Sequence, residues 1–199
     1  WQNTFFKAIS RSDLNVAFSF GYNPTMKISM GIALPLFCES TTELVDIELL
    51  DNVDSEYVKN ELQRVLPKES EVISVKQIDR SAPSIDQTAC WAEYKVKIAD
   101  VKNKLCDFEK LMYNTDRVLS SDEILVEKKN KKGLVKTVNI RTSIGSHRYE
   151  NDCLFIVLKT GQGSEIPPLR ADVLMNIIAP DVIFDITRVK FFTESLHEL

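Results

Sequence analysis

The run Cys-Leu-Phe-Ile-Val-Leu-Lys at residues 153–159 most strongly limits what this chain can fold into. Apolar side chains occupy both alternating faces of this segment, so we expect a central strand that is covered on both sides. A second strand-like run, residues 90–98, alternates cleanly and places Tyr94 and Val96 on one face. The second half of the chain should therefore be built around a sheet with a buried middle.

The second half alternates strand-like and helix-like patterns in a definite order. Beside the two runs above, the pattern predicts strands at 123–129, 134–141 and 186–192, and helices at 101–114 and 169–178. The order is strand, helix, three strands, helix and strand. Without one added strand, this is the split β-α-β plan of a ferredoxin-like sandwich.

The first half carries similar elements in a less regular form. Helical stripes mark residues 3–11 and 55–66, and Asp54 stands at the N-cap position of the second helix. Strand patterns cover residues 16–20, 27–35, 44–50 and 72–78. If the first two of these form one bent strand, and a first strand lies before Trp1 or is missing, the order is again β-α-β-β-α-β.

We therefore predict an α+β fold of two ferredoxin-like (split β-α-β) halves with mainly antiparallel sheets. The polar stretch around Pro83 is the best linker in the sequence. The predicted boundaries are an N-terminal half at 1–80, a linker at 81–89 and a C-terminal half at 90–199. With 44% hydrophobic residues, a chain of 199 residues can bury a real core.

The cysteine pattern is typical of structural thiols. Cys38, Cys90, Cys106 and Cys153 are separated by 52, 16 and 47 positions and include no Cys-x-x-Cys pair. Their even number allows disulfides, but thiols among apolar neighbours favour an intracellular protein, so we expect buried free cysteines and a cytoplasmic location. No run approaches the ~18 apolar residues of a membrane-spanning helix, and we expect no membrane partner.

Charge is distributed unevenly, although the formal net charge is only −4. Residues 39–56 carry seven acidic residues and no basic one, whereas residues 126–148 carry seven basic residues and a single Glu. We interpret the acidic run as a solvated face. The basic run centres on a predicted hairpin, whose turn at 130–133 reads Asn-Lys-Lys-Gly.

Two interpretations of the basic hairpin stay open. Its side chains could attract the phosphates of RNA. Alternatively, the lysines only protect an exposed edge ribbon from pairing with other strands. The candidate anion- or RNA-binding residues are Lys128, Lys129, Lys131, Lys132, Lys136, Arg141 and Arg170.

The stretch Phe-Ser-Phe-Gly-Tyr-Asn-Pro at residues 18–24 has the residues of a turn between two strand patterns. Gly21 allows a positive φ, and Pro24 forces Asn23 into an extended conformation. A bend needs neither a phenol nor an amide, so we interpret Tyr22 and Asn23 as lining a groove; the alternative is that Tyr22 covers an edge of the core. The candidate groove residues are Ser19, Gly21, Tyr22, Asn23, Lys27, Ser40 and Glu43.

This turn is part of a longer motif: Ser-x-Gly-Tyr-Asn-Pro, a strand pattern that ends in Pro-Leu, and then Ser-x-x-Glu-x-x-Asp. Over residues 4–50 the sequence resembles the family of radical SAM-linked (radical SAM-associated) proteins of unknown function. Those proteins occur alone or as the C-terminal domain of cobalamin-binding radical SAM proteins. The family has Phe at the position of Tyr22 and one more residue before the motif's Glu. The matching residues are Ser19, Gly21, Tyr22, Asn23, Pro24, Pro35, Leu36, Ser40, Glu43 and Asp46.

Two positions depart from the family's pattern. The family has Asp-x-Arg on a strand after a basic hairpin, where this chain has Asn139-Ile140-Arg141. It also has Arg-Pro at the start of the last helix, where this chain has Arg170-Ala171. Roles that rest on the family's Asp and Pro are therefore not carried over to this chain.

The resemblance implies a place beside radical SAM chemistry. It implies a radical SAM partner, fused or separate, that carries the [4Fe–4S] cluster and S-adenosylmethionine, with no cofactor in this chain. The residues agree with this, since the cysteines lack the spacing of cluster ligands. Neither His147 nor His197 belongs to a pattern of nucleophile and base or of metal ligands.

The function that we expect is therefore a non-catalytic accessory or substrate-recognition domain of a radical SAM enzyme, which could also bind RNA. Two alternatives stay open. One is an independent enzyme whose active site is not recognisable in the sequence, and the other is a structural assembly domain without a small ligand.

Overall fold

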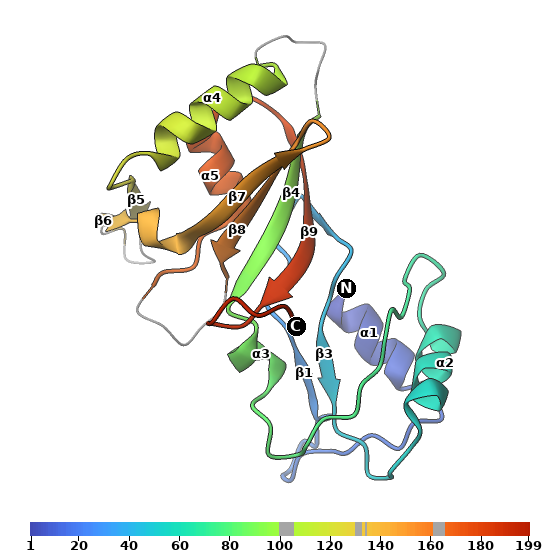
Figure 1. The fold of residues 1–199 in the computed structure, drawn as a ribbon. Coiled ribbons are helices and arrows are strands. Elements are labelled where there is room, and N and C mark those ends of the chain that lie inside the picture. The colour runs from blue at the N-terminus through green and yellow to red at the C-terminus, as the bar shows by residue number, and fades with distance from the viewer. Residues whose placement is uncertain (100–105, 130–132, 134, 161–165) are drawn as a thin grey trace. The chain divides into compact units, whose positions relative to one another are not determined.

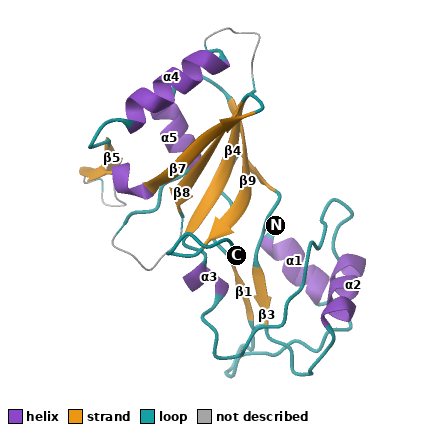
Figure 2. Ribbon diagram, in the orientation of Figure 1, coloured by secondary structure: helices purple, strands orange, loops and turns teal. Residues whose placement is uncertain are grey.

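The computed structural model describes residues 1–99, 106–129, 133, 135–160 and 166–199, and Figure 1 labels most of its helices and strands. The chain divides into two compact units. Unit 1 comprises Trp1–Ser29 and Val45–Ser84, and unit 2 comprises Met30–Leu44 and Ile85–Leu199. Helices and strands occur in both (Figure 2), and most strand pairs are antiparallel. The predicted mixture of α and β structure with mainly antiparallel sheets is thus confirmed.

The predicted domain boundaries are not settled by this division and stay a prediction. Residues 30–44 belong to unit 2, although they precede much of unit 1 in the sequence. The predicted linker at 81–89 includes a short helix, α3 Ile85–Thr88.

Unit 2 is built on a five-stranded sheet in the order β2-β9-β4-β8-β7. Its strands are β2 Cys38–Ser40, β4 Trp91–Ile98, β7 Ile144–Glu150, β8 Cys153–Lys159 and β9 Phe184–Phe192. Neighbours run antiparallel, except that β2 runs parallel to β9. The predicted central strand is confirmed, because β8 lies between β4 and β7 and all of its residues except Phe155 are buried.

Two helices, α4 Phe108–Leu119 and α5 Ala171–Ile178, lie on one face of this sheet (Figure 1). Their apolar stripes pack against the alternating side chains of β4 and β8. The fully buried core includes Leu111, Leu174, Tyr94, Leu154 and Ile156. Among the described helices of the chain, none is long and apolar enough to span a membrane.

The predicted basic hairpin is confirmed as a hairpin. β5 Leu125–Lys129 pairs antiparallel with β6 Val135–Asn139 and forms a two-stranded sheet of its own. Gly133 has φ +81°, the left-handed conformation expected of the turn glycine. The turn residues Lys131 and Lys132 lie outside the described residues.

One prediction for unit 2 needs correction, and two of its strands were not predicted. The helix predicted at 101–114 begins at Phe108, because Asp107 is its N-cap and accepts a hydrogen bond from the Lys110 N–H at 2.8 Å. Residues 100–105 lie outside the described part of the chain. The sequence analysis predicts neither β7, whose polar residues resemble a loop, nor the three-residue strand β2.

Unit 1 contains α1 Gln2–Ile9, α2 Ser55–Val65 and most of a small sheet of β1 Ile28–Met30 and β3 Val45–Ile47, in which Met30 is counted with unit 2. The predicted N-cap is confirmed, since the Asp54 carboxylate accepts hydrogen bonds from the N–H groups of Glu56 and Tyr57. The buried apolar residues of unit 1 are Phe5, Ala8, Ile9, Leu14, Val16, Ala17, Val58 and Leu62.

The strand prediction at 72–78 is wrong. This segment has no strand partner, and Ile73 and Ile78 are exposed. The strand patterns at 16–20 and 27–35 are confirmed only in part, as two isolated bridges and the short strand β1.

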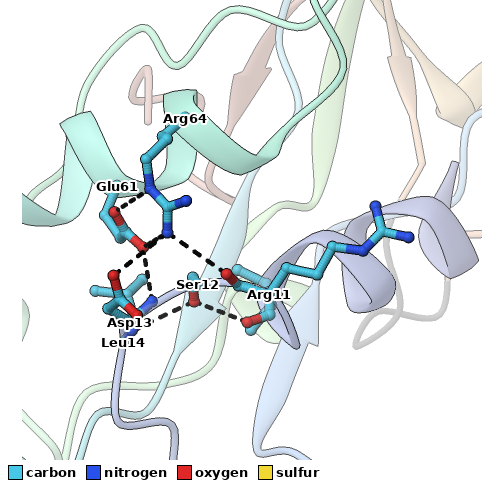
Figure 3. A network of polar contacts seen from close by, with 7 residues as sticks. Arg11, Ser12, Asp13, Leu14, Glu61 and Arg64 are labelled. Carbon is cyan, nitrogen blue, oxygen red and sulfur yellow. Dashed lines mark hydrogen bonds and ion pairs between the residues drawn. The ribbon is translucent and has the colours of Figure 1, made fainter.

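A polar network joins α2 to the segment that follows α1 (Figure 3). Glu61, buried on α2, accepts hydrogen bonds from Arg64 Nε at 2.8 Å and from the Asp13 N–H at 2.6 Å. Arg64 Nη2 also reaches the Asp13 carboxylate at 3.4 Å and the Arg11 carbonyl at 3.5 Å. The Arg64 guanidinium, followed by the Asp13 N–H, lowers the pKa of Glu61 to about 2.

This network makes part of the stability of unit 1 dependent on pH. Because the pKa of Glu61 is lower in the folded chain than its ordinary value of 4.5, its stabilisation is present above pH 4.5 and is lost as the pH falls towards about 2. We expect Glu61→Gln to lower the free energy of unfolding at pH 6, and the difference from the wild type to shrink steadily below pH 4.5. Urea unfolding at several pH values measures this; a difference that stays constant from pH 6 to pH 2.5 would contradict it.

Candidate functional site

Residues 16–28 form a hairpin whose neck is fixed by short polar contacts. The Ser19 N–H donates to the Thr25 carbonyl at 2.8 Å, and the Thr25 N–H donates to Ser19 Oγ at 3.0 Å. A bridge pairs Phe18 with Met26, and the Lys27 N–H donates to the Ala17 carbonyl at 2.8 Å. Ser19 is thus a structural residue that locks the neck of the hairpin.

At this neck and beyond it the hairpin presents three aromatic side chains, which we call the aromatic tip: Phe18, Phe20 and Tyr22. Phe20 and Tyr22 are completely exposed, and Phe18 is 53% exposed. Gly21, between them, has φ +138°, which explains the glycine. Asn23 is exposed as well. Tyr22 therefore does not cover an edge of the core, which was the alternative interpretation.

Lys27 is engaged within unit 1. Its Nζ lies 3.0 Å from Glu48 Oε2, and Arg80 pairs with the same carboxylate. The hydrogen bond from Lys27 is the largest of the contacts that lower the pKa of Glu48. Lys27 therefore contributes to a local ion-pair cluster beside the hairpin.

The remaining predicted groove residues, Ser40 and Glu43, belong to unit 2. Ser40 Oγ donates to the Thr42 carbonyl at 2.8 Å and accepts from the Thr42 N–H at 3.2 Å, which shapes a tight turn after β2. Glu43 Oε1 accepts a hydrogen bond from Arg188 Nη2 at 2.6 Å. The single groove predicted from the sequence thus draws on both units and stays a prediction.

Glu43 leads to a cluster that the sequence analysis does not find. We call it the Arg188 centre: Arg188 on β9, Glu43, Tyr94 on β4 and Cys38 on β2. Arg188 is fully buried, pairs in register with Tyr94, and lies over the Phe191 ring at 4.5 Å. Burial raises the pKa of Tyr94 and of the half-buried Cys38 thiol, so both are held in their neutral forms.

Two nitrogens of this guanidinium lack a partner. Among the described residues, neither Nε nor Nη1 of Arg188 has a hydrogen-bond partner, and both atoms are buried. The Tyr94 hydroxyl interacts with the same guanidinium, and this interaction opposes the effect of burial on the pKa of Tyr94. Buried donors are almost always paired in folded proteins, so this exception calls for an explanation.

The register of the basic hairpin brings two lysine positions opposite each other. β5 and β6 pair Lys128 directly with Lys136, and the Lys136 side chain is exposed.

The two predicted anion-binding arginines make local contacts. Arg141 Nη1 donates to the Ile144 carbonyl at 3.4 Å, and Arg170 forms two hydrogen bonds to Asp172, at 2.9 and 2.7 Å. Asn139 Oδ1 accepts hydrogen bonds from the N–H groups of Ile124 at 3.1 Å and of Arg141 at 3.0 Å. An amide oxygen suffices for these two bonds.

A further polar cluster was not predicted. Asp116 Oδ1 on α4 accepts a hydrogen bond from the Tyr149 hydroxyl at 2.7 Å and lies 3.2 Å from His147 Nε2.

Within the described ranges, no three His, Cys, Asp or Glu side chains are grouped as a metal ion would require. The four cysteines are free thiols.

Searches of curated proteins and of solved structures found no match to this chain. A family model does match: that of an "uncharacterized protein conserved in bacteria", DUF2344, over residues 1–168. This range includes the aromatic tip, Glu43 and the basic hairpin. Since the match covers most of the 199 residues, the chain belongs to the DUF2344 family.

Proposed function

We propose that this chain is a non-catalytic accessory domain that recognises a radical SAM protein, fused to it or separate, through the aromatic tip. In this proposal the partner carries the [4Fe–4S] cluster and S-adenosylmethionine, and this chain contributes recognition of the partner or its substrate. The observation that carries the proposal is the full exposure of Phe20 and Tyr22 on a hairpin with a fixed neck.

Aromatic side chains in this setting favour a protein partner. Large exposed apolar groups that gather at one place commonly mark interaction sites, and Tyr and Phe are enriched in the centres of interfaces. The fixed neck lowers the conformational entropy that would be lost on binding. Lys27 and Arg80 both pair with Glu48 beside the hairpin, whereas the fully exposed side chains of the tip itself are aromatic rings.

The link to radical SAM proteins comes from the sequence resemblance. Its most distinctive part, Ser19 to Pro24, is the neck and tip of the hairpin. Ser19 and Gly21 have structural roles there, whereas Tyr22 and Asn23 are free to contact a partner. We also propose a cytoplasmic location, which the free thiols of the four cysteines support.

The scaffold of unit 2 supports a recognition role. Its elements β4-α4-β7-β8-α5-β9 and the strand order β9-β4-β8-β7 favour a ferredoxin-like sandwich, to which β2 and the β5–β6 hairpin are added. We propose this plan for unit 2. Unit 1 contributes two helices and the small β1–β3 sheet, and we do not extend the proposal to it.

The aromatic tip can be tested by co-purification from native cells. We expect the wild-type chain to retain a protein that contains iron, sulfide and an S-adenosylmethionine site, and Phe20→Ser/Tyr22→Ser to retain at least about tenfold less, the loss that about 1.4 kcal/mol produces. Tyr113→Ser, which removes an aromatic ring exposed on α4, is the matched control and should behave like the wild type. Equal capture by the double variant, or capture of only a second copy of this chain, would contradict the proposal.

RNA binding by the basic hairpin is a second candidate function. The specific observation in its favour is the direct pairing of Lys128 with Lys136 on an antiparallel ribbon. Phosphates bound to these lysines would release counterions, so affinity should fall steeply with salt.

A charge-matched comparison tests the RNA proposal. Replacing Lys128, Lys129, Lys131 and Lys132 with Ser should weaken RNA binding and flatten the salt dependence by roughly 0.7 per lost single-strand contact. The control variant replaces four exposed lysines elsewhere with Ser, namely Lys7, Lys68, Lys76 and Lys97. It changes the net charge by the same amount as the hairpin variant and should leave the salt dependence of RNA binding unchanged. If both variants bind cellular RNA alike across salt concentrations, the RNA proposal is contradicted, and the lysines only keep the exposed ribbon from pairing with other strands.

A further inference from the structure

We propose that the buried guanidinium of Arg188 forms the floor of a carboxylate-binding subsite, and that Glu43 is its displaceable internal occupant. The ligand class is a small molecule or a chain end that carries a single carboxylate. This inference is independent of the aromatic tip and of the basic hairpin.

The free donors of Arg188 carry the argument. A guanidinium has five N–H donors, and Glu43 accepts from only one nitrogen, Nη2, through the single oxygen Oε1. Nε and Nη1 have no partner among the described residues, although the side chain is fully buried. An unmet buried donor costs free energy, so an acceptor that reaches these nitrogens gains more than the same acceptor would in water.

The pairing of Glu43 is weaker than the site allows. Arginine and carboxylate groups often meet through two parallel hydrogen bonds, which adds strength and fixes their orientation. Glu43 makes one such bond, from a loop position after β2. A free carboxylate, unlike Glu43, can adjust its position to meet two donors.

The Arg188 centre has partly exposed residues on one side and fully buried residues beneath them. The side chain of Glu43 is 26% exposed, and those of Arg170 and Asp172, which act electrostatically on Cys38 at this end of the sheet, are 55% and 41% exposed. Arg188 and Tyr94 below them are fully buried. A ligand would therefore enter from the side of Glu43.

The backbone can keep its place while Glu43 moves. The Thr41 N–H donates to the Arg188 carbonyl at 3.0 Å, and β2 pairs with β9 from Cys38 to Ser40. These contacts hold the segment independently of the Glu43 side chain. Rotation of Glu43 towards water then opens its position beside Nη2.

Charge balance decides which ligand fits. Arg188 is neutralised by Glu43, and Arg170 by Asp172. Replacing Glu43 with a ligand carboxylate keeps this balance, whereas a phosphate dianion would add an uncompensated charge in a buried place. The subsite should thus prefer a monocarboxylate to phosphate.

The test follows the Arg188 Nε–H signal by NMR, in protein with ¹⁵N-labelled arginine, during titration with sodium formate. Sodium chloride at matched ionic strength and sodium phosphate are the comparison probes. We expect a saturable shift with formate in the wild type and none with chloride. Glu43→Ala should bind formate about tenfold more tightly, because the internal competitor is gone, a gain that corresponds to about 1.4 kcal/mol.

The variant Glu43→Ala/Arg188→Lys keeps the positive charge but removes the planar guanidinium and its paired N–H donors. This variant should lose the formate response. Since Arg188→Lys removes the Arg188 Nε–H signal, the response of this double variant is measured as the difference between its thermal unfolding midpoints in formate and in chloride. If the double variant does not fold, the comparison of Glu43→Ala with the wild type decides the outcome. No formate response in the wild type overturns the proposal, even if Glu43→Ala responds, because Glu43 is then a permanent partner and the free donors hold only water. A stronger response to phosphate than to formate would overturn the ligand class.

Discussion

A fully buried guanidinium sets the main constraint on unit 2. Arg188 lies in the sheet between Tyr94 and the β2 segment, and the carboxylate that pairs with its buried charge belongs to Glu43, 145 positions away in the sequence. The register of β9 with β2 and with β4, and the turn made by Ser40, all bring acceptors or ring faces to this one side chain.

The sequence predicts those elements whose side chains alternate between a core and solvent, or are apolar throughout. β4, β8, β9 and α5 follow from such patterns, and α2 follows from its Asp54 cap. β7 is an edge strand with polar residues, and β2 has only three residues, so neither produces a pattern. The segment 72–78 alternates as a strand would, yet finds no partner, because pairing depends on distant segments that a local pattern does not contain.

The same limit applies to the sites. The turn residues Gly21 and Pro24 predict a bend, and the aromatic tip lies at that place, but the full exposure of Phe20 and Tyr22 is not predicted. Arg188 is not found, although a charged residue within the apolar pattern of 186–192 is a usable signal for a buried ion pair. Its partner could not be predicted, since Glu43 stands in a run of acidic residues that is ordinary for a solvated surface. The family resemblance points to Glu43 as a candidate site residue but does not say what its side chain does. The hydrogen bond with Arg188 gives this side chain a role.

The central claim is that the buried charge of Arg188, and not its packing, makes Glu43 necessary. A double-mutant cycle on the free energy of unfolding tests this directly, with Glu43→Ala, Arg188→Met and the double variant. The account predicts that Glu43→Ala alone destabilises the chain by about 3 kcal/mol, because it leaves a buried charge unpaired, and that the double variant is more stable than Glu43→Ala. If the two single effects simply add, so that Arg188→Met destabilises the Glu43→Ala background further, the claim is contradicted.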